Sequence, residues 1–291
     1  MARSHQGRLI IGCGYLGRRI AQRWLREGYC VSGTTRTPDH AAELGRLGVE
    51  PIQCDVLASA SLAALPAVHT VVHCVGLDRG AGQSMRSVYV DGLDNVLVHL
   101  PQAERFIYVS SSSVYGQCHG EEVDETAATA PLEESGQVVL AAEQLLWSRL
   151  PNAIVLRFGG IYGPGRLLRQ KAVQAGEPIQ ADPDRWLNLI HVEDGASAVL
   201  AAEARAQSGA VYNICDDQPV RRREFLTLLA QLLDAPEPRF VSPLANASLP
   251  PHERSNRRIS NRRMHAELAV QLAYPSFREG LRASCPTRPP A

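Results

Sequence analysis

Three glycines near the start of the chain have the spacing of a phosphate-binding loop. Residues 12–17 read Gly-Cys-Gly-Tyr-Leu-Gly, after a short apolar run and before a segment with apolar residues at helical spacing. In that strand–turn–helix context, Gly12 permits the tight turn, Gly14 lets a pyrophosphate approach the backbone, and Gly17 lets the helix pack on the strand. The helix N-terminus offers N–H groups and a positive dipole end to phosphates. The pattern predicts a dinucleotide-binding loop, with an ordinary strand–helix turn as the alternative.

The end of the second strand-like run indicates which dinucleotide this loop prefers. An Asp or Glu there would hydrogen-bond the ribose 2′-OH of NAD and repel a 2′-phosphate. The chain has Thr34, Thr35 and Arg36 at this point. Arg36 can pair with a phosphate, and the threonine hydroxyls add donors. We therefore predict NADP(H) over NAD(H), with a solvated arginine at a strand end as the alternative.

These residues need a parallel sheet to hold them together. Strand-like and helix-like segments alternate from Arg8 to Arg157, and repeated βα units of this length imply a doubly wound parallel α/β sheet with right-handed crossovers. Ligands in such folds bind at the carboxyl ends of the strands. The residues expected to contact the cofactor there are Gly12, Gly14, Tyr15, Leu16, Gly17, Thr35, Arg36, Asp55, Val56, Cys74, Val75 and Gly76.

The pattern changes after Arg157, where glycines and prolines punctuate a loop-rich stretch. We predict a Rossmann-type dinucleotide-binding domain over residues 1–158 and a smaller substrate lobe over 159–291. The two are expected to be partly interleaved, with about 188–215 returning to the Rossmann sheet. Arginines cluster at Arg254–Arg263, which we interpret as a solvated or lobe-docking segment.

Composition limits the classes of partner. Thirty basic residues balance thirty acidic ones, so no net charge draws the chain to nucleic acid or an anionic membrane. Its seven cysteines include no Cys-x-x-Cys pair, which argues against a metal site or a disulfide framework. The first eight residues lack the apolar stretch of a signal peptide. We expect a cytoplasmic monomer or homodimer that binds a small-molecule substrate.

A serine-rich stretch makes the sequence recognisable. Residues 109–116 read Val-Ser-Ser-Ser-Ser-Val-Tyr-Gly, and this segment resembles a motif of the extended short-chain dehydrogenases/reductases, the NAD-dependent epimerase/dehydratase family. Three later stretches agree with that family in the same order, and they are residues 156–165, 188–194 and 211–214. The resemblance implies a Rossmann domain with a C-terminal lobe that closes over the substrate, which in this family is often a nucleotide sugar.

The resemblance also shows where this chain departs from the family. Family members use a Ser or Thr together with a Tyr and a Lys four residues apart on a helix. Ser111 matches the Ser/Thr position. Alignment on Glu143 assigns Ser135 to the Tyr position and Val139 to the Lys position, and no Tyr or Lys occurs between residues 116 and 150. A missing general acid/base usually costs on the order of 10²–10⁴ in rate.

Other residues could substitute for the missing pair. Tyr115 and Tyr162 carry phenols near the expected cleft, and Tyr162 could also line the substrate pocket. Arg157 ends a strand at the ligand-binding edge, where it could contact a substrate anion or form a core ion pair. Lys171 is the only lysine in the chain and could reach a substrate anion, although a solvated helix residue is the simpler interpretation. His191 lies close to Asp194 in sequence, and we expect a structural role for both.

Two functions are consistent with these residues. The first is an NAD(P)-binding, epimerase/dehydratase-like oxidoreductase that acts on a small polar substrate, including a nucleotide sugar, with a non-standard catalytic set that contains Ser111. The alternative is a non-catalytic dinucleotide-binding sensor or regulatory protein, which the residues Ser135 and Val139 favour.

Overall fold

The apolar runs of the sequence lie side by side in one parallel sheet. A computed structural model describes residues 7–241 and 255–285. Its seven-stranded sheet has the order β12-β7-β5-β4-β1-β2-β3, and every pairing is parallel. The strands are β1 (Arg8–Ile11), β2 (Val31–Thr35), β3 (Glu50–Gln53), β4 (Thr70–His73), β5 (Arg105–Ser111), β7 (Ile154–Phe158) and β12 (Val211–Ile214). The chain reverses direction across the sheet between β1 and β4, which confirms the doubly wound Rossmann-type fold.

Helices cover both faces of this sheet, and this explains why its strands are apolar along their whole length. Ile10 faces the core beneath α1 (Tyr15–Arg26) and α6 (Val192–Arg205). Its neighbours Leu9 and Ile11 face the opposite core, beneath α3 (Gly92–His99) and α4 (Glu134–Arg149). The alternation follows from the two-residue period of a strand. On the outer side, α2 (Pro38–Arg46) follows β2 and has Thr37 as its N-cap.

The helix that connects β4 to β5 contains a π-helical turn. Met85 and Arg86 are α-helical, Ser87–Asp91 form the π-helical turn, and the α-helix continues from Gly92. An added Cβ at Gly92 would lie 2.7 Å from Val56 Cγ2, so the helix approaches the segment after β3 very closely there. Turns of this kind insert one extra residue into a helix and often occur near functional sites. The extra residue carries no periodicity signal, so the sequence pattern does not reveal it.

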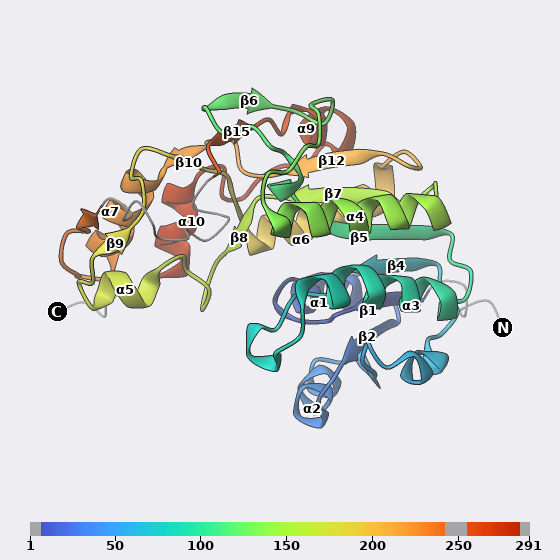
Figure 1. Ribbon diagram of the computed structural model, residues 1–291. Helices are drawn as coiled ribbons and strands as arrows, with labels where there is room; N and C mark the ends of the chain where they lie inside the picture. Colours follow the sequence, from blue (N-terminus) through green and yellow to red (C-terminus); the bar gives the residue numbers. More distant parts are fainter. Residues whose placement is uncertain (1–6, 242–254, 286–291) are drawn as a thin grey trace.

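The second lobe has its own apolar core, which gathers around Tyr162, Phe225 and Phe277. Figure 1 shows α5, α7 and α10 grouped at one end of the sheet, beyond β8. The elements of this lobe are α5 (Gln170–Gln174), β9 (Ile179–Gln180), β10 (Trp186–Leu187), β13 (Val220–Arg221), α7 (Arg222–Leu232), β14 (Phe240–Val241) and α10 (Phe277–Ser284).

After residue 159, the chain returns to the Rossmann layers more than once. Between residues 188 and 215, β11 (Leu189–His191) pairs with β8 (Gly160–Tyr162), and α6 and β12 then join the Rossmann layers. A later segment also returns, because β15 (Arg257–Ile259) pairs with β6 (Glu121–Val123). The following helix, α9 (Arg262–Leu268), adds Met264 and Leu268 to the core beneath α6. The sequence pattern did not reveal this second return.

The arginines at the start of β15 and α9 belong to this docking segment. Arg257 is buried and donates to the backbone oxygens of Tyr115 and Gln117. Arg254, the first residue of the predicted arginine cluster, lies outside the described residues. Among the helices of the described ranges, none combines the length and the apolar character needed to cross a membrane.

Candidate functional site

The glycine loop is held between β1, β2 and β4, and its first glycine has no space for a side chain. Gly12 has a φ of +84°, and a Cβ there would lie 2.7 Å from the Cα of Val75. Its N–H donates to Thr34 Oγ1 at 2.8 Å, and the N–H of Cys13 donates to the Thr34 carbonyl at 3.0 Å. The end of β2 therefore fixes the loop, and the position of Gly12 requires glycine.

The other two glycines serve different purposes. A Cβ at Gly17 would lie 2.9 Å from Ile10 Cγ2, so this glycine lets α1 pack closely on β1. A Cβ at Gly14, by contrast, would meet no atom within 4 Å. Gly14 is the N-cap of α1 and supplies no side-chain cap, which leaves the N–H groups of the first turn directed at the space in front of the loop. The residues therefore fit a bound pyrophosphate.

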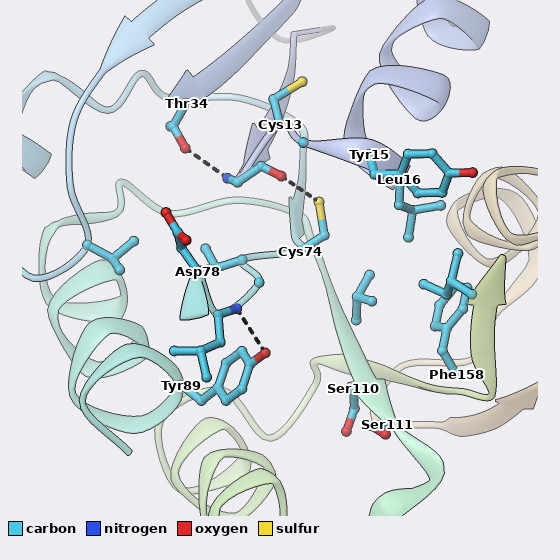
Figure 2. A pocket seen from close by; sticks show the side chains of 18 of the residues that line it. Cys13, Tyr15, Leu16, Thr34, Cys74, Asp78, Tyr89, Ser110, Ser111 and Phe158 are labelled. Atoms are coloured by element: carbon cyan, nitrogen blue, oxygen red, sulfur yellow. Dashed lines mark hydrogen bonds between the residues drawn. The ribbon is translucent and has the colours of Figure 1, made fainter. Parts of the chain in front are cut away.

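A cavity of about 1000 Å³ opens in front of this loop at the carboxyl ends of the strands. It extends from the end of β2 past the glycine loop and β4 to the end of β5, and then to residues 158–161 and Arg166. Figure 2 shows Thr34, Cys74 and Ser111 on different sides of it. Ten of the residues predicted to contact the cofactor line this cavity, and they are Gly12, Gly14, Tyr15, Leu16, Thr35, Arg36, Val56, Cys74, Val75 and Gly76.

Two predicted contact residues point elsewhere. Gly17 is buried beneath the loop, where it makes the helix–strand contact described above. Asp55 uses its carboxylate to accept the N–H of Leu57 at 2.9 Å, and it does not line the cavity. Asp55 therefore stabilises the turn after β3. Its neighbours Cys54 and Val56 line the cavity.

Burial favours the protonated thiol form of the cysteines in the cavity wall. Burial raises the pKa of Cys13 to about 12 and raises the pKa of Cys74 still further. Cys74 Sγ donates to the carbonyl of Gly12 at 3.2 Å, so it supports the glycine loop from the side of β4. Among the described residues, no group of His, Cys, Asp and Glu side chains is arranged to hold a metal ion.

The residues at the end of β5 lie at the far side of the cavity from β2. Ser111 lines it and accepts the N–H of Ser113 at 3.2 Å, which leaves the Ser111 hydroxyl proton available to a ligand oxygen. Val139 of α4 also lines the cavity. Ser135, one turn earlier, lies in the first turn of α4 and is not among the lining residues. The structure thus brings Val139, but not Ser135, to the wall beside Ser111.

A buried charge network stands directly behind that wall. Glu143 is fully buried, and Arg157 binds it with Nη2 at 2.7 Å and Nε at 3.1 Å. Ser110 Oγ donates to the same carboxylate at 2.5 Å. Arg157 Nη1 also donates to the Tyr115 hydroxyl, which in turn donates to Asn213 Oδ1 at 2.8 Å. Of the two interpretations left open for Arg157, the geometry favours the core ion pair.

Two tyrosines predicted near the cleft are therefore interior residues. Tyr115 is 1% exposed and belongs to the network just described. Tyr162 is 2% exposed, and its hydroxyl faces α10, where a Cβ on Gly280 would overlap it. Neither lines the cavity. Their catalytic and substrate-binding roles stay predictions that this geometry does not favour.

His191 and Asp194 make the contacts of structural residues. His191 Nε2 lies 3.2 Å from Ser284 Oγ, and burial lowers the pKa of His191 to about 4. Asp194 accepts the N–H groups of Ala273 and Tyr274 at 2.8 and 2.9 Å. Both residues anchor the C-terminal segment to α6. Lys171 is exposed on α5 and does not line the cavity.

Several cavity residues were missed by the sequence analysis. Tyr89 comes from the π-helical turn and accepts the N–H of Leu77 at 3.1 Å (Figure 2). Arg166 follows the Gly-Pro-Gly turn and lies over the ring of Tyr15, whose hydroxyl donates to the Pro164 carbonyl at 3.1 Å. Asp78 follows β4 and pairs with Arg36. Their places after strand ends were a usable signal for Asp78 and Arg166, whereas Tyr89 depends on the unpredicted π-helical turn.

Comparison with known proteins agrees with this geometry. The model of the NAD dependent epimerase/dehydratase family matches residues 9–215. The chain belongs to this family.

Its relatives include the Escherichia coli K12 protein YeeZ, which is 31% identical over 278 residues, or 91% of this chain and 95% of YeeZ. The structure of a conserved protein from Silicibacter pomeroyi is similar, with 31% sequence identity and a TM-score of 0.79. The superposition covers 96% of this chain and 97% of the S. pomeroyi chain. A UDP-glucuronic acid 4-epimerase from Bacillus cereus, solved with UDP-glucuronic acid and NAD, has a TM-score of 0.77 at 20% identity over 96% of this chain and 97% of its own. The chain thus has the NAD-binding Rossmann fold of an oxidoreductase family that is NAD(P)-dependent.

The first prediction concerns the open face of the glycine loop. Gly14→Val should abolish dinucleotide binding because the new side chain projects into the space in front of the loop. The melting temperature should change little, since no neighbouring atom is displaced. Gly17→Val is the matched control and should mainly lower the melting temperature, because its Cβ would press on Ile10. Normal cofactor titration by a folded Gly14→Val protein would show that the loop is not the binding site.

The second prediction concerns the buried ion pair. Arg157→Ala leaves Glu143 buried without its cation and should destabilise the fold by about 3–5 kcal/mol. The combined change Arg157→Met and Glu143→Leu should recover most of this loss. Arg166→Ala, which removes an exposed cavity arginine, should stay within about 0.5 kcal/mol of the wild type. Chemical denaturation measures all three, and an unchanged free energy of unfolding for Arg157→Ala would contradict the structural role.

Proposed function

We propose that this protein is an NADP(H)-preferring oxidoreductase of the epimerase/dehydratase type, with a catalytic set that does not contain the family's Tyr and Lys. Its proposed substrate is a small polar molecule, and a nucleotide sugar is the class that the B. cereus epimerase suggests. The observation that carries the proposal is the continuity of the cavity. One space joins the glycine loop to Ser111 and to Arg166 of the second lobe.

The residues divide the cavity into two parts with different tasks. The glycine loop and the first turn of α1 would hold the pyrophosphate, and Arg36 would contact the adenosine end. A bound nicotinamide dinucleotide supplies or accepts a hydride. Ser111 would donate its hydroxyl proton to a substrate oxygen and so orient the reacting carbon. Gly160, Ile161 and Arg166 would close the space on the side of the second lobe.

One observation favours a non-catalytic dinucleotide-binding sensor as the second candidate. Val139 is buried among Val114, Tyr115 and Ile259, with its side chain in the cavity wall. An alkyl side chain there can neither lower the pKa of a phenol nor hold a ribose hydroxyl. The two candidates differ in one measurable property, because a sensor binds the dinucleotide without turning it over.

The cofactor preference gives the third prediction. The wild-type protein should bind NADPH more tightly than NADH in a fluorescence or calorimetric titration, because Arg36 can pair with the 2′-phosphate. In Arg36→Ala the difference should shrink by roughly tenfold, the equivalent of about 1.4 kcal/mol. Arg18→Ala is the control, since Arg18 also lines the cavity but lies on α1 and not at the end of β2. It should reduce the difference between the NADPH and NADH affinities less than Arg36→Ala does. Equal wild-type affinities for the two cofactors would overturn the assignment.

The fourth prediction concerns the missing pair. The wild-type protein should transfer little or no hydride with the nucleotide sugars that the family commonly uses. The double substitution Ser135→Tyr with Val139→Lys should tighten cofactor binding, because a charged hydrogen bond to the ribose contributes about 1–3 kcal/mol. Gln137→Lys adds the same charge on the exposed side of α4 and should leave binding unchanged.

Two results would count against this account of the missing pair. One is no gain in affinity from the double substitution in a protein that remains folded. The other is robust wild-type turnover of a nucleotide sugar that survives Ser111→Ala. The same turnover assay separates the oxidoreductase from the sensor, since measurable hydride transfer with any carbonyl substrate excludes the sensor.

A further inference from the structure

A carboxylate from another strand end lies beside the end of β2, where β2 itself has no Asp or Glu. β2 ends in Thr35 and Arg36, without an Asp or Glu. In the folded chain Asp78, which follows β4, reaches the same place. Its Oδ2 lies 2.7 Å from Arg36 Nη2, and both residues line the cavity. Figure 2 shows Asp78 among the cavity side chains.

The loop that carries Asp78 is held in position by its own contacts. Asp78 Oδ1 accepts the N–H of Gly80 at 3.0 Å and caps the short helix η3 (Arg79–Ala81). The preceding N–H, that of Leu77, donates to the Tyr89 hydroxyl. Asp78 Oδ1 therefore accepts a hydrogen bond from its own loop, and Asp78 Oδ2 accepts one from Arg36. The hydrogen bonds from Arg36 and Gly80 hold the pKa of Asp78 below its usual range, so Asp78 is charged at neutral pH.

The pair with Arg36 is solvated and can open. The two side chains are 46% and 52% exposed, and an ion pair with that exposure contributes little to stability. A phosphate monoester carries about −1.5 to −2 charges at neutral pH and offers three acceptor oxygens. The 2′-phosphate of NADPH would compete with Asp78 Oδ2 for the guanidinium of Arg36. The negatively charged Asp78 carboxylate would also repel this phosphate. A ribose 2′-OH, by contrast, can donate to that same carboxylate.

We propose that Asp78 is a second cofactor-specificity residue, which occupies Arg36 and thereby limits the preference for NADPH over NADH. The proposal rests on the proposed function only in that the cavity binds a nicotinamide dinucleotide with its adenosine ribose between Arg36 and Asp78. Arg36 favours a 2′-phosphate, and Asp78 favours a 2′-hydroxyl. The preference for one dinucleotide is the balance of these two side chains, which come from the ends of different strands.

The test is the affinity of the purified full-length chain for NADPH and NADH, measured by titration of cofactor fluorescence. Asp78→Asn keeps an oxygen for the Gly80 N–H and removes the charge. It should tighten NADPH binding about 3- to 10-fold, and NADH binding should stay constant or weaken. Asp39→Asn is the matched control, since it removes an exposed acid from the first turn of α2 that does not line the cavity. It should leave the NADPH/NADH affinity ratio unchanged.

The same substitution in the Arg36→Ala background tests whether Asp78 acts through Arg36. The gain in NADPH affinity should largely disappear there. A gain of the same size in that background would overturn the competition for Arg36. An unchanged or smaller NADPH/NADH ratio in Asp78→Asn would overturn the role of Asp78 itself while leaving dinucleotide binding intact. Failure of the wild-type chain to bind either dinucleotide would instead overturn the proposed function.

Discussion

The close approach of the glycine loop to the strands around it is the constraint on which the rest of the site depends. Gly12 lies against the backbone of Val75, and Gly17 lies against Ile10, so neither position can hold a side chain. These contacts fix the start of α1 at the edge of the sheet. Because α1 begins there, its first-turn N–H groups face the cavity and not the core. Thr34 and Cys74 then support the loop from the two neighbouring strands, through the N–H and the carbonyl of Gly12 respectively.

Behind the other end of the cavity, the chain keeps a buried ion pair and exposes an apolar wall. Glu143 and Arg157 join α4 to β7, and Ser110 extends the network to β5. One turn before Glu143, where the family resemblance indicates a lysine, Val139 reaches the cavity. At this position the wall is apolar, whereas the ion pair that stabilises the fold lies behind it. Val139 in the cavity wall and the Glu143–Arg157 pair behind it therefore contribute to different parts of the structure, and Ser110 contacts both the cavity and the pair.

The sequence predicted the Rossmann layers well, because glycine spacing and strand apolarity are local signals. The strands from β1 to β7 and the helices that cover them lie in the alternating segments between Arg8 and Arg157, as predicted. It predicted side-chain directions less well. Tyr162 and Arg157 lie in the last residues of β8 and β7, at the edge of the sheet where ligand-binding residues occur, yet both side chains turn into the interior. Gly280 leaves space for Tyr162, and Glu143 pairs with Arg157. The pairing of Asp78 with Arg36 and the return of β15 to β6 join segments far apart in the chain, and one sequence carries no local signal for such contacts.

The most direct test of the central claim is a crystal structure of the full chain grown with NADPH. The account predicts electron density for the pyrophosphate at the first turn of α1, against Gly12–Gly17, with the 2′-phosphate beside Arg36 and the nicotinamide towards Ser111 and Val139. Density for the dinucleotide elsewhere on the molecule, or none in front of Gly14 at a saturating concentration, would contradict it.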